Sequence, residues 1–406
     1  MSRRSGEATM NEKNKPVIVS AVRTPLGSFS GVFSPLSATK LGSVAIAEAL
    51  KRIDLPGEHV DSVFMGCVLA AGLGQAPARQ ASIGAGIPHS VGATTVNKVC
   101  GSSLQTVIMA SQHIQLGDGN IFVAGGMEHM TNAPYLLTRA RQGYQLGHGE
   151  LVDSLIKDGL WDVYNQFHMG HGGELCAKKY GISRAEADEF ALESYRRARM
   201  AIASGAFKNE IVSVEVPQKK ADPLIVIDDE EPNRVNLEKM PSLKPAFQDD
   251  GVLTVGNSPS CNDGAAVMVV MEEQEAIHRG MKPLARIVGY AGAALAPEWF
   301  TIAPVDAVRN LLKRTGHTID QIDLFEINEA FSSVALTVNR ELGLDPSKVN
   351  VNGGAVALGH PIGATGARIL TTLLYALEAR GGQLGIASLC IGGGEALAVM
   401  IQRCDA

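Results

Sequence analysis

Short apolar runs rich in β-branched residues alternate along this chain with longer segments whose apolar positions recur every three or four residues. The short runs are typical of strands, and the longer segments are typical of helices with one buried face. Four of the longer segments, residues 38–53, 104–116, 305–315 and 367–378, are predicted to be helices. This alternation predicts an α/β fold in which mixed or parallel sheets are covered by helices.

A weak internal repeat indicates that the pattern arises from a duplication. Residues 60–66 resemble residues 322–328, and the apolar runs 16–21 and 285–290 form a second pair in the same order. A glycine-led helix followed by a strand comes later in both halves. One such match would be chance, but several in one order, roughly 260 residues apart, predict a duplicated α/β unit.

The residues between the two halves have a different texture. They contain a charged helix predicted at 183–204, an alternating strand at 211–216 and several turns rich in Pro and Gly. We predict an insertion that covers the mouth of the site, because a disordered linker would not carry such elements. The predicted units are a flexible tail at 1–15, a first half at 16–129 and 262–281, an inserted loop domain at 130–261, and a second half at 282–406.

Composition and charge exclude several classes of partner. The 406 residues carry 36 basic and 42 acidic side chains, a net charge of −6, and no basic patch that would bind nucleic acid. Apolar runs such as residues 265–271 are too short to span a bilayer, so we expect no membrane partner. Residues 1–15 resemble neither a secretory signal nor a transit peptide. Six scattered cysteines without metal-binding spacing predict a reducing, cytoplasmic location, no disulfide framework and no metal.

Cys100 is the first candidate for catalytic chemistry. It follows an apolar strand predicted at 94–99 and immediately precedes a helix that begins Gly101-Ser102-Ser103. The positive end of a helix dipole favours a thiolate, so this position suits a nucleophile. A lone cysteine is more often a small buried apolar residue, and this alternative stays open.

Two glycine-rich loops near the C-terminus each carry one reactive side chain. His360 lies within residues 352–366, where the glycines allow close approach of the backbone and Pro361 fixes it. Cys390 follows a strand predicted at 384–389 and leads three glycines. We interpret His360 as a general base and Cys390 as an exposed thiol. A hydrogen-bonded structural histidine and a packing cysteine are the plainer alternatives.

Asn328 ends the strand predicted at 322–327. An asparagine in this place can hold a water molecule or donate to an oxyanion. Taken alone, it is at least as often the N-cap of a helix.

Together these residues resemble the thiolase family, from residue 21 almost to the C-terminus. The resemblance is carried by AVRTP at 21–25, GQAPARQA at 74–81, NKVCGS at 97–102, AGGME at 124–128, NDGAA at 262–266, NEAF at 328–331, the glycine-rich loop around His360, and CIGGG at 390–394. The chain departs from the family pattern at Pro259, His171 and Glu395.

The resemblance implies a fold and a mechanism. The fold would be thiolase-like, with duplicated βαβαβ halves in a layered α-β-α-β-α core and an inserted loop domain. Cys100 would be acylated by a CoA thioester after His360 takes its proton, and Cys390 would move the α-proton of a second acetyl-CoA. One oxyanion would be bound by His360 and a water on Asn328, and the other by the backbone N–H groups of Cys100 and Gly392. No cofactor or metal is expected, because the thioester supplies the leaving group and acidifies the α-carbon.

The resemblance also implies substrates. Acetyl-CoA, acetoacetyl-CoA and CoA would be the partners in a reversible Claisen condensation, and the chain would form a dimer or tetramer. The segment 160–170 resembles the acyl pocket of short-chain members. A broader 3-ketoacyl-CoA thiolase of fatty-acid β-oxidation and a non-catalytic, thiolase-like lipid-binding protein stay open as alternatives. The residues predicted to bind substrate are Leu160, His168, Met169, Arg234, Val255, Ser258, Ser260 and Phe331.

Overall fold

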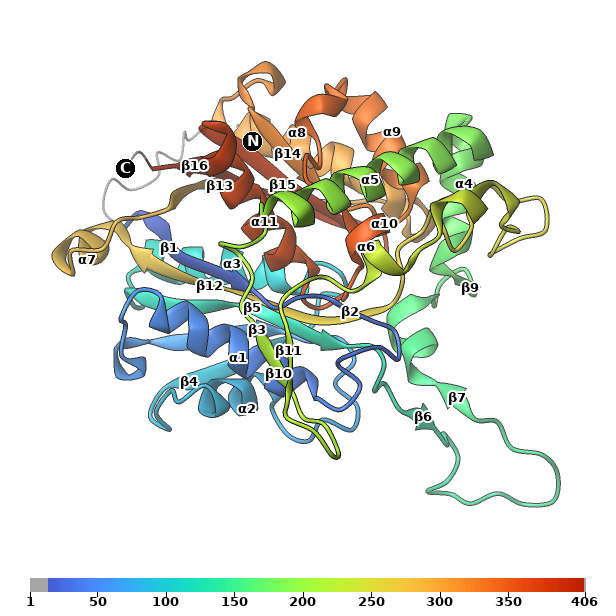
Figure 1. Ribbon diagram of the computed structural model, residues 1–406, viewed down its shortest axis with the longest axis horizontal. Helices are drawn as coiled ribbons and strands as arrows, with labels where there is room; N and C mark the ends of the chain where they lie inside the picture. Colours follow the sequence, from blue (N-terminus) through green and yellow to red (C-terminus); the bar gives the residue numbers. More distant parts are fainter. Residues whose placement is uncertain (1–13, 405–406) are drawn as a thin grey trace, which may run out of the picture.

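A computed structural model describes residues 14–404, and its first half is built around five strands (Figure 1). They are β1 (Pro16–Arg23), β3 (Ser62–Gly66), β4 (Gly92–Val96), β5 (Ile121–His129) and β12 (Asn262–Glu272), and the short β2 (Gly27–Ser28) pairs with β12. Strand β3 runs parallel to β4 on one side and to β5 on the other. Strands β12 and β1 follow antiparallel.

The second half repeats this arrangement with β13 (Ala285–Ala294), β14 (Leu324–Ile327), β15 (Leu384–Ile391) and β16 (Glu395–Arg403). Strand β14 runs parallel to β15, and β16 and β13 follow antiparallel, in the order of β3, β5, β12 and β1. A parallel bridge between Phe325 and Val349 stands where the first half has β4. The two halves join in one sheet through β1 and β13. The predicted duplication is confirmed.

Helices cover both outer faces of the sheet and fill the space between its halves. Helices α1 (Ala38–Lys51) and α2 (Pro77–Gly84) pack on the first half, and α8 (Ala303–Thr315) and α9 (Ser332–Leu342) pack on the second. Helices α3 (Ser102–Leu116) and α11 (Thr365–Arg380) lie between them, packed against each other and against strands of both halves. The resulting α-β-α-β-α order confirms the predicted fold class.

Helix α11 is the most deeply buried helix of this centre. Its apolar residues fill the core between the halves, and its polar residues Thr365 and Arg368 are buried with them. A buried polar side chain needs internal partners, and those of Thr365 lie in the functional site described below.

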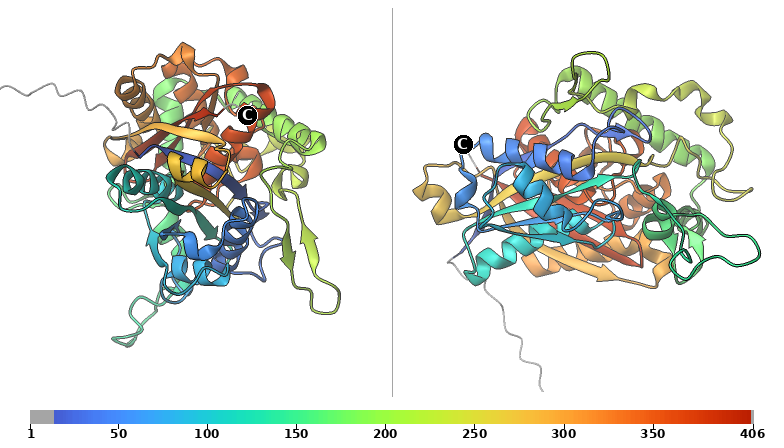
Figure 2. Two further views of the ribbon diagram at one scale, coloured as in Figure 1. Left: turned by 90° about the vertical axis from the view of Figure 1, so that its left-hand side faces the viewer. Right: turned by 90° about the horizontal axis from the view of Figure 1, so that it is seen from below.

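The insertion leaves the first half after β5 and returns at β12. Its longest helix, α5 (Arg184–Ser204), begins with a capping box between Ser183 and Glu186 and packs against α9 and the short α10 (Ala355–Leu358). Loop 137–151 extends away from the body of the molecule (Figures 1 and 2). The insertion also contains β6 (Tyr135–Leu136), β7 (Val152–Asp153), a π-helical turn (Leu155–Leu160), β8 (Trp161–Asp162), β9 (Phe167–His168), α4 (Met169–Tyr180), β10 (Val214–Val216), β11 (Leu224–Val226), α6 (Glu231–Arg234) and a 3-10 turn at Leu237–Ser242. Outside the insertion, the remaining elements are α7 (Glu273–His278) and 3-10 turns at Gly57–His59, Pro297–Ile302, Ile319–Gln321 and Pro346–Lys348.

A buried ion pair fastens the insertion to the first strand. The Nε of Arg23 lies 2.5 Å from Oε1 of Glu210, and its Nη1 lies 2.7 Å from Oδ1 of Asp229. All three side chains are buried, and Glu210 also accepts a hydrogen bond from Thr372 of α11 at 3.1 Å. Removing one partner of a buried pair typically costs about 3–5 kcal/mol, so this contact holds the insertion over the sheet.

Within residues 14–404, no helix combines the length and apolar character needed to cross a membrane. The tail predicted at 1–15 falls mostly on residues 1–13, which lie outside the described part of the chain. The other predicted domain limits stay predictions.

Candidate active site

Cys100, His360 and Cys390 line one cavity of about 250 Å³, although they come from separate parts of the chain. Cys100 precedes α3, His360 lies between α10 and α11, and Cys390 is near the end of β15. Most of the other lining residues are apolar, among them Leu155 and Phe300. The structure therefore brings together the three residues that the sequence singled out for chemistry.

The loop that carries Cys100 is held in a strained conformation. Val99 has a φ of +46°, a left-handed backbone that β-branched residues rarely adopt. The Oγ of Ser102 accepts from Lys98 N at 2.8 Å and donates to Val99 O at 2.6 Å. Asn97 Oδ1 accepts from Val99 N at 3.0 Å. Strain of this kind persists only where its surroundings enforce it, and here the turn leaves Cys100 on the cavity wall.

The thiol of Cys100 differs from expectation in its protonation. Burial raises its pKa to about 11, although hydrogen bonds from the N–H groups of Gly392 and of Cys100 itself act in the opposite direction. The expectation that the N-terminus of α3 favours a thiolate is wrong here, because desolvation of the sulfur outweighs these donors. Cys100 is a neutral thiol at pH 7 and needs a base.

His360 is in the form that a base requires. Its Nδ1 lies 2.7 Å from Oγ1 of Thr365, and that hydroxyl donates to Pro361 O at 2.9 Å. The hydroxyl has only one proton, so Nδ1 must be the donor and Nε2 carries the lone pair. Burial, helped by the charge of Arg368, lowers the pKa of His360 to about 3 and keeps the ring neutral. A neutral imidazole with an unprotonated Nε2 accepts a proton from a thiol.

This buried neutral histidine predicts a pH-dependent stability. The unfolded chain takes up a proton on His360 near its ordinary pKa of 6.5, whereas the folded chain does so only near pH 3. The contribution of His360 to the free energy of unfolding is therefore fully present above pH 6.5 and is lost as the pH falls below it. His360→Asn should make the free energy of unfolding less steep with pH, by up to about 1.4 kcal/mol per pH unit in this range. Urea unfolding at several pH values measures the slope.

The control is His148→Asn in the exposed loop 137–151, which should follow the wild-type slope because this side chain is exposed in both states. The same slope for His360→Asn and wild type between pH 4.5 and 6.5 would mean that the ring is not held neutral.

The loop of His360 is fastened to the first half by close packing. The carbonyl oxygen of Gly363 lies so near Gly126 that a Cβ at 126 would overlap it. Glu128, fully buried in β5, accepts hydrogen bonds from Gly363 N at 2.8 Å and from the N–H groups of residues 68–69 at 3.0 and 3.1 Å. Burial raises the pKa of Glu128 to about 7. This carboxyl thus links the two halves beside the cavity.

Cys390 is buried, with 1 % of its surface exposed, so the predicted exposed thiol is wrong. It is the next-to-last residue of the buried strand β15 and lines the cavity. Burial raises its pKa well above the ordinary range of a thiol. Once deprotonated, such a thiol is a strong base.

Asn328 directly follows β14 and is buried. Among the described residues, neither its Nδ2 nor its Oδ1 has a hydrogen-bond partner. Helix α9 begins at Ser332 with Phe331 as its N-cap, so the alternative role of Asn328 as an N-cap is wrong. A buried amide without a protein partner, two residues before the cavity residue Ala330, is suited to hold a water.

The residues predicted to bind substrate divide into two groups. Leu160, His168, Met169, Ser260 and Phe331 line the cavity. The ring of His168 stacks on Phe247 at 5.3 Å, and its Nδ1 caps α4 by accepting from Gly170 N at 3.0 Å. Their contacts with an acyl group stay predictions.

The other three predicted residues are not part of the cavity wall. Ser258 is buried, Val255 is 73 % exposed, and Arg234 forms an ion pair with Glu230 at 2.9 Å. Their contacts with CoA stay predictions as well.

Several residues that connect the site were missed in the sequence. Lys98 and Glu395 form an ion pair that joins the Cys100 loop to the Cys390 loop, which gives the unusual Glu395 a partner. Thr365 fixes the tautomer of His360, and Glu128 joins the halves. The only available signal was a charged or polar residue inside an otherwise apolar or glycine-rich run.

Two family models match the chain. The model described as "Thiolase, N-terminal domain" matches residues 16–274, and the model described as "Thiolase, C-terminal domain" matches residues 281–403. Together they span nearly all of the described residues.

Curated relatives and solved structures agree with these models. The chain is 49% identical to an acetyl-CoA acetyltransferase of Schizosaccharomyces pombe, over 95% of this chain and 98% of that protein. It is 50% identical to acetyl-CoA acetyltransferase 1 of Arabidopsis thaliana, over 95% of this chain and 93% of that protein. The crystal structure of Acat5 thiolase from Ascaris suum in complex with coenzyme A matches with a TM-score of 0.92 and 44% identity, covering 96% of this chain and 100% of that one. The acetyl-CoA acetyltransferase of Bacillus anthracis matches with a TM-score of 0.94 and 40% identity, covering 97% and 99%.

Proposed function

The chain belongs to the thiolase family, and from this we propose that it is an acetyl-CoA C-acetyltransferase, which interconverts two acetyl-CoA molecules with acetoacetyl-CoA and CoA. The observation that carries the proposal is a cavity of about 250 Å³ lined by two thiols and a neutral histidine. Ligand pockets of ordinary size begin near 300 Å³, so this one suits a short acyl group. Relatives of nearly full length that bear this name support the same reaction.

In the first half-reaction, His360 Nε2 takes the proton of Cys100 as its sulfur attacks the carbonyl carbon of acetyl-CoA. The oxyanion of the tetrahedral intermediate accepts from the N–H groups of Cys100 and Gly392, because both lie against the sulfur that carries the acyl group. The carbon–sulfur bond to CoA breaks, and Cys390 gives its proton to the leaving CoA sulfur. The products are acetyl-Cys100, CoA and a Cys390 thiolate.

In the second half-reaction, the Cys390 thiolate removes an α-proton from a second acetyl-CoA. Its raised pKa makes it basic enough for this poor acid. His360, now protonated, and a water held by Asn328 would donate to the enolate oxygen. The α-carbon attacks the acetyl carbonyl, and Cys100 leaves as a thiolate that recovers its proton from His360. Acetoacetyl-CoA is released, and Cys390 retains the α-proton, so the resting state is restored.

Two alternatives differ from this proposal in a specific way. A broader 3-ketoacyl-CoA thiolase would need a longer acyl pocket. The cavity here is small, and the side chains of Leu160 and Met169 line it. A binding protein without turnover would need neither thiol nor the neutral histidine, so their convergence argues against it.

The test of the proposal is thiolysis of 3-ketoacyl-CoA thioesters of increasing length. We expect kcat/KM to be highest for acetoacetyl-CoA and to fall by at least about tenfold when the chain gains two methylenes, because they have no room in the cavity. Met169→Ala, which shortens a wall residue, should recover part of the activity on the longer substrate. A higher kcat/KM of the wild type for the longer chains would contradict the proposal, as would the absence of turnover on acetoacetyl-CoA.

We further propose that the protein works as a cytoplasmic dimer or tetramer and uses no cofactor apart from its CoA substrates. The scattered cysteines support a reducing compartment. Loop 137–151 exposes Leu137, Tyr144, Leu146 and Leu151, which supports a contact with a second copy.

A further inference from the structure

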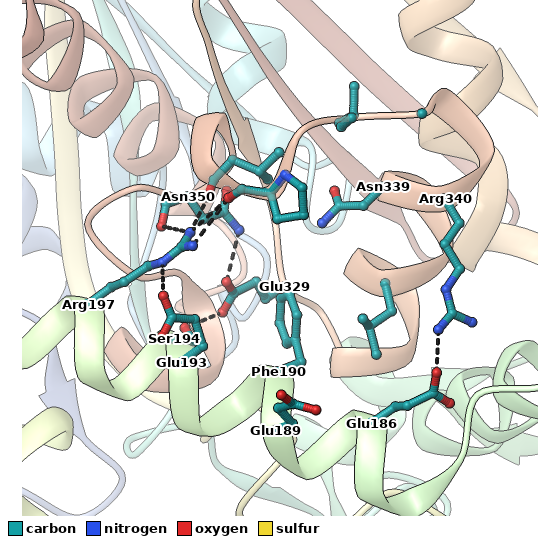
Figure 3. Close-up of a pocket in the computed structure, with 15 residues that line it drawn as sticks. Glu186, Glu189, Phe190, Glu193, Ser194, Arg197, Glu329, Asn339, Arg340 and Asn350 are labelled. Atoms are coloured by element: carbon teal, nitrogen blue, oxygen red, sulfur yellow. Dashed lines mark hydrogen bonds and ion pairs between the residues drawn. The ribbon is translucent and has the colours of Figure 1, made fainter.

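One buried carboxylate joins two of the loops that form the site. Glu329 follows Asn328 and is 1 % exposed. Its Oε1 accepts a hydrogen bond from Asn350 Nδ2 at 2.9 Å. Its Oε2 accepts from Ser194 Oγ at 2.8 Å and from Val356 N at 3.0 Å. Figure 3 shows Glu329, Asn350 and Ser194 together, at the wall of a second cavity of about 630 Å³.

Asn350 is itself held in one orientation. Its Oδ1 accepts from Ile327 N, and its Nδ2 donates to Ile327 O, each at 2.8 Å. The backbone of Asn350 is left-handed, with a φ of +46°, which asparagine tolerates better than most residues. Because both ends of the amide are occupied, it cannot rotate without losing a bond to the end of β14. Only its NH₂ group can face Glu329.

The second connection runs to the segment before His360. Ser194 of α5 donates to Glu329 and accepts from Gly354 N at 3.0 Å. A Cβ at Gly354 would overlap the Glu329 carboxylate, so the backbone approaches as closely as glycine allows. Val356 belongs to α10, the single turn that leads into Gly359 and His360.

We propose that Glu329 is a positioning residue for the reaction proposed above, and that it fixes Asn328 and the His360 loop relative to each other. The amide of Asn328 has no protein partner within residues 14–404, so only its backbone and its neighbours hold it in place. Glu329 ties that backbone to α10, to α5 and to the loop of Asn350 through one donor each. Asn328 and His360 are the two groups assigned to the enolate oxygen, so their spacing decides how well that oxygen is stabilised.

Glu329→Gln removes this role with almost no change of volume. Asn350 Nδ2 and Val356 N are donors on opposite oxygens of the carboxylate, and neither can become an acceptor. Whichever way the glutamine amide turns, its NH₂ group faces one of them. A donor–donor conflict in a buried site costs more than the loss of one hydrogen bond, so the two loops must separate.

The matched control is Asp323→Asn at the other end of the same strand. Asp323 directly precedes β14 and accepts from Gln383 N at 2.7 Å and Leu384 N at 2.9 Å. It holds β14 through two partly buried backbone donors on one carboxylate oxygen, far along the strand from Asn328. A merely structural role of Glu329 predicts that the loss of activity follows the loss of melting temperature in the same way in both variants.

The experiment measures exchange of the acetyl-CoA α-protons with deuterated solvent, together with KM and the melting temperature. For Glu329→Gln we expect a fall of about 10²-fold in exchange and in kcat, with KM for acetyl-CoA unchanged within about twofold. Asp323→Asn should keep the wild-type exchange rate. Equal exchange rates for Glu329→Gln and wild type, or an equal loss in Asp323→Asn, would overturn the inference.

A double-mutant cycle adds a measurement that a change in stability alone would not affect. If Glu329 acts largely through Asn328, Glu329→Gln should cost less than about tenfold in exchange when Asn328 is already alanine. Full additivity would overturn the inference. If Glu329→Gln does not fold, Ser194→Ala serves instead, with a smaller fall in exchange at unchanged KM expected and a wild-type rate contradicting it. A wild type that exchanges no α-protons would refute the proposed function instead.

Discussion

Cys100→Ala should not become acetylated by acetyl-CoA, and its turnover should fall by on the order of 10⁴-fold or more, as when a nucleophile that works as part of a unit is removed. Cys100 carries the acyl group in both directions of the reaction. The cavity contains a second thiol, but Cys390 lies on the buried strand β15, whereas Cys100 receives the N–H groups of Gly392 and of its own backbone. Only at Cys100 would a tetrahedral oxyanion meet two donors.

Mass spectrometry of the intact protein after incubation with acetyl-CoA measures this acetylation directly. The control is Cys176→Ala, which removes another buried thiol that lies outside the cavity and bonds to Thr337 at 3.3 Å. It should acetylate like wild type. Unchanged acetylation of Cys100→Ala, mapped to Cys390 or to any other residue, would show that the assignment of the nucleophile is wrong.

Cys390→Ala should separate the two half-reactions. The thiol of Cys100 still has His360 as its base, so acetylation should proceed and the acetyl-enzyme should accumulate. Condensation and α-proton exchange should fall by about 10²–10⁴-fold, the usual contribution of a general acid or base. Rapid mixing followed by mass spectrometry measures acetylation, and exchange in deuterated solvent measures the second step.

The outcome that would contradict this division is a Cys390→Ala enzyme that exchanges α-protons at the wild-type rate. A loss of acetylation as large as that of Cys100→Ala would contradict it too, because it would make both thiols necessary for one step. Protonation of the leaving CoA by Cys390 allows a moderate slowing of acetylation in this variant.

The sequence was informative where a residue sits at the end of a predicted strand or the start of a predicted helix. Cys100 before α3, His360 in its glycine loop and Cys390 near the end of β15 were all found in this way, since strand ends and glycine loops are where backbone can present a side chain. The duplication could also be predicted from sequence, because the apolar runs that form β3 and β14 resemble each other and occupy the same place in the two halves.

The protonation states could not be predicted in the same way. Position at a helix end argues for a thiolate at Cys100, but burial raises its pKa to about 11, and burial depends on residues from the insertion and from the second half. His360 shows the same dependence, since its tautomer follows from Thr365. Desolvation is a property of the assembled cavity, not of a local segment.

The carboxylates that hold the loops were hidden for a similar reason. Glu329 stands beside Asn328 in the sequence, yet its partners Ser194 and Asn350 come from α5 and from a loop after α9. Glu128 likewise meets Gly363 far along the chain. A buried acid in an apolar run is a visible anomaly, but its partners appear only when the chain is folded.

The measurement that tests the central claim most directly is a crystal structure of the protein soaked with acetyl-CoA. The account predicts an acetyl thioester on Cys100, with its carbonyl oxygen within hydrogen-bonding distance of the N–H groups of Cys100 and Gly392, and with the Cys390 sulfur facing the acetyl group. An acetyl group on Cys390, or a bound acetyl-CoA whose thioester lies away from both sulfurs, would contradict it.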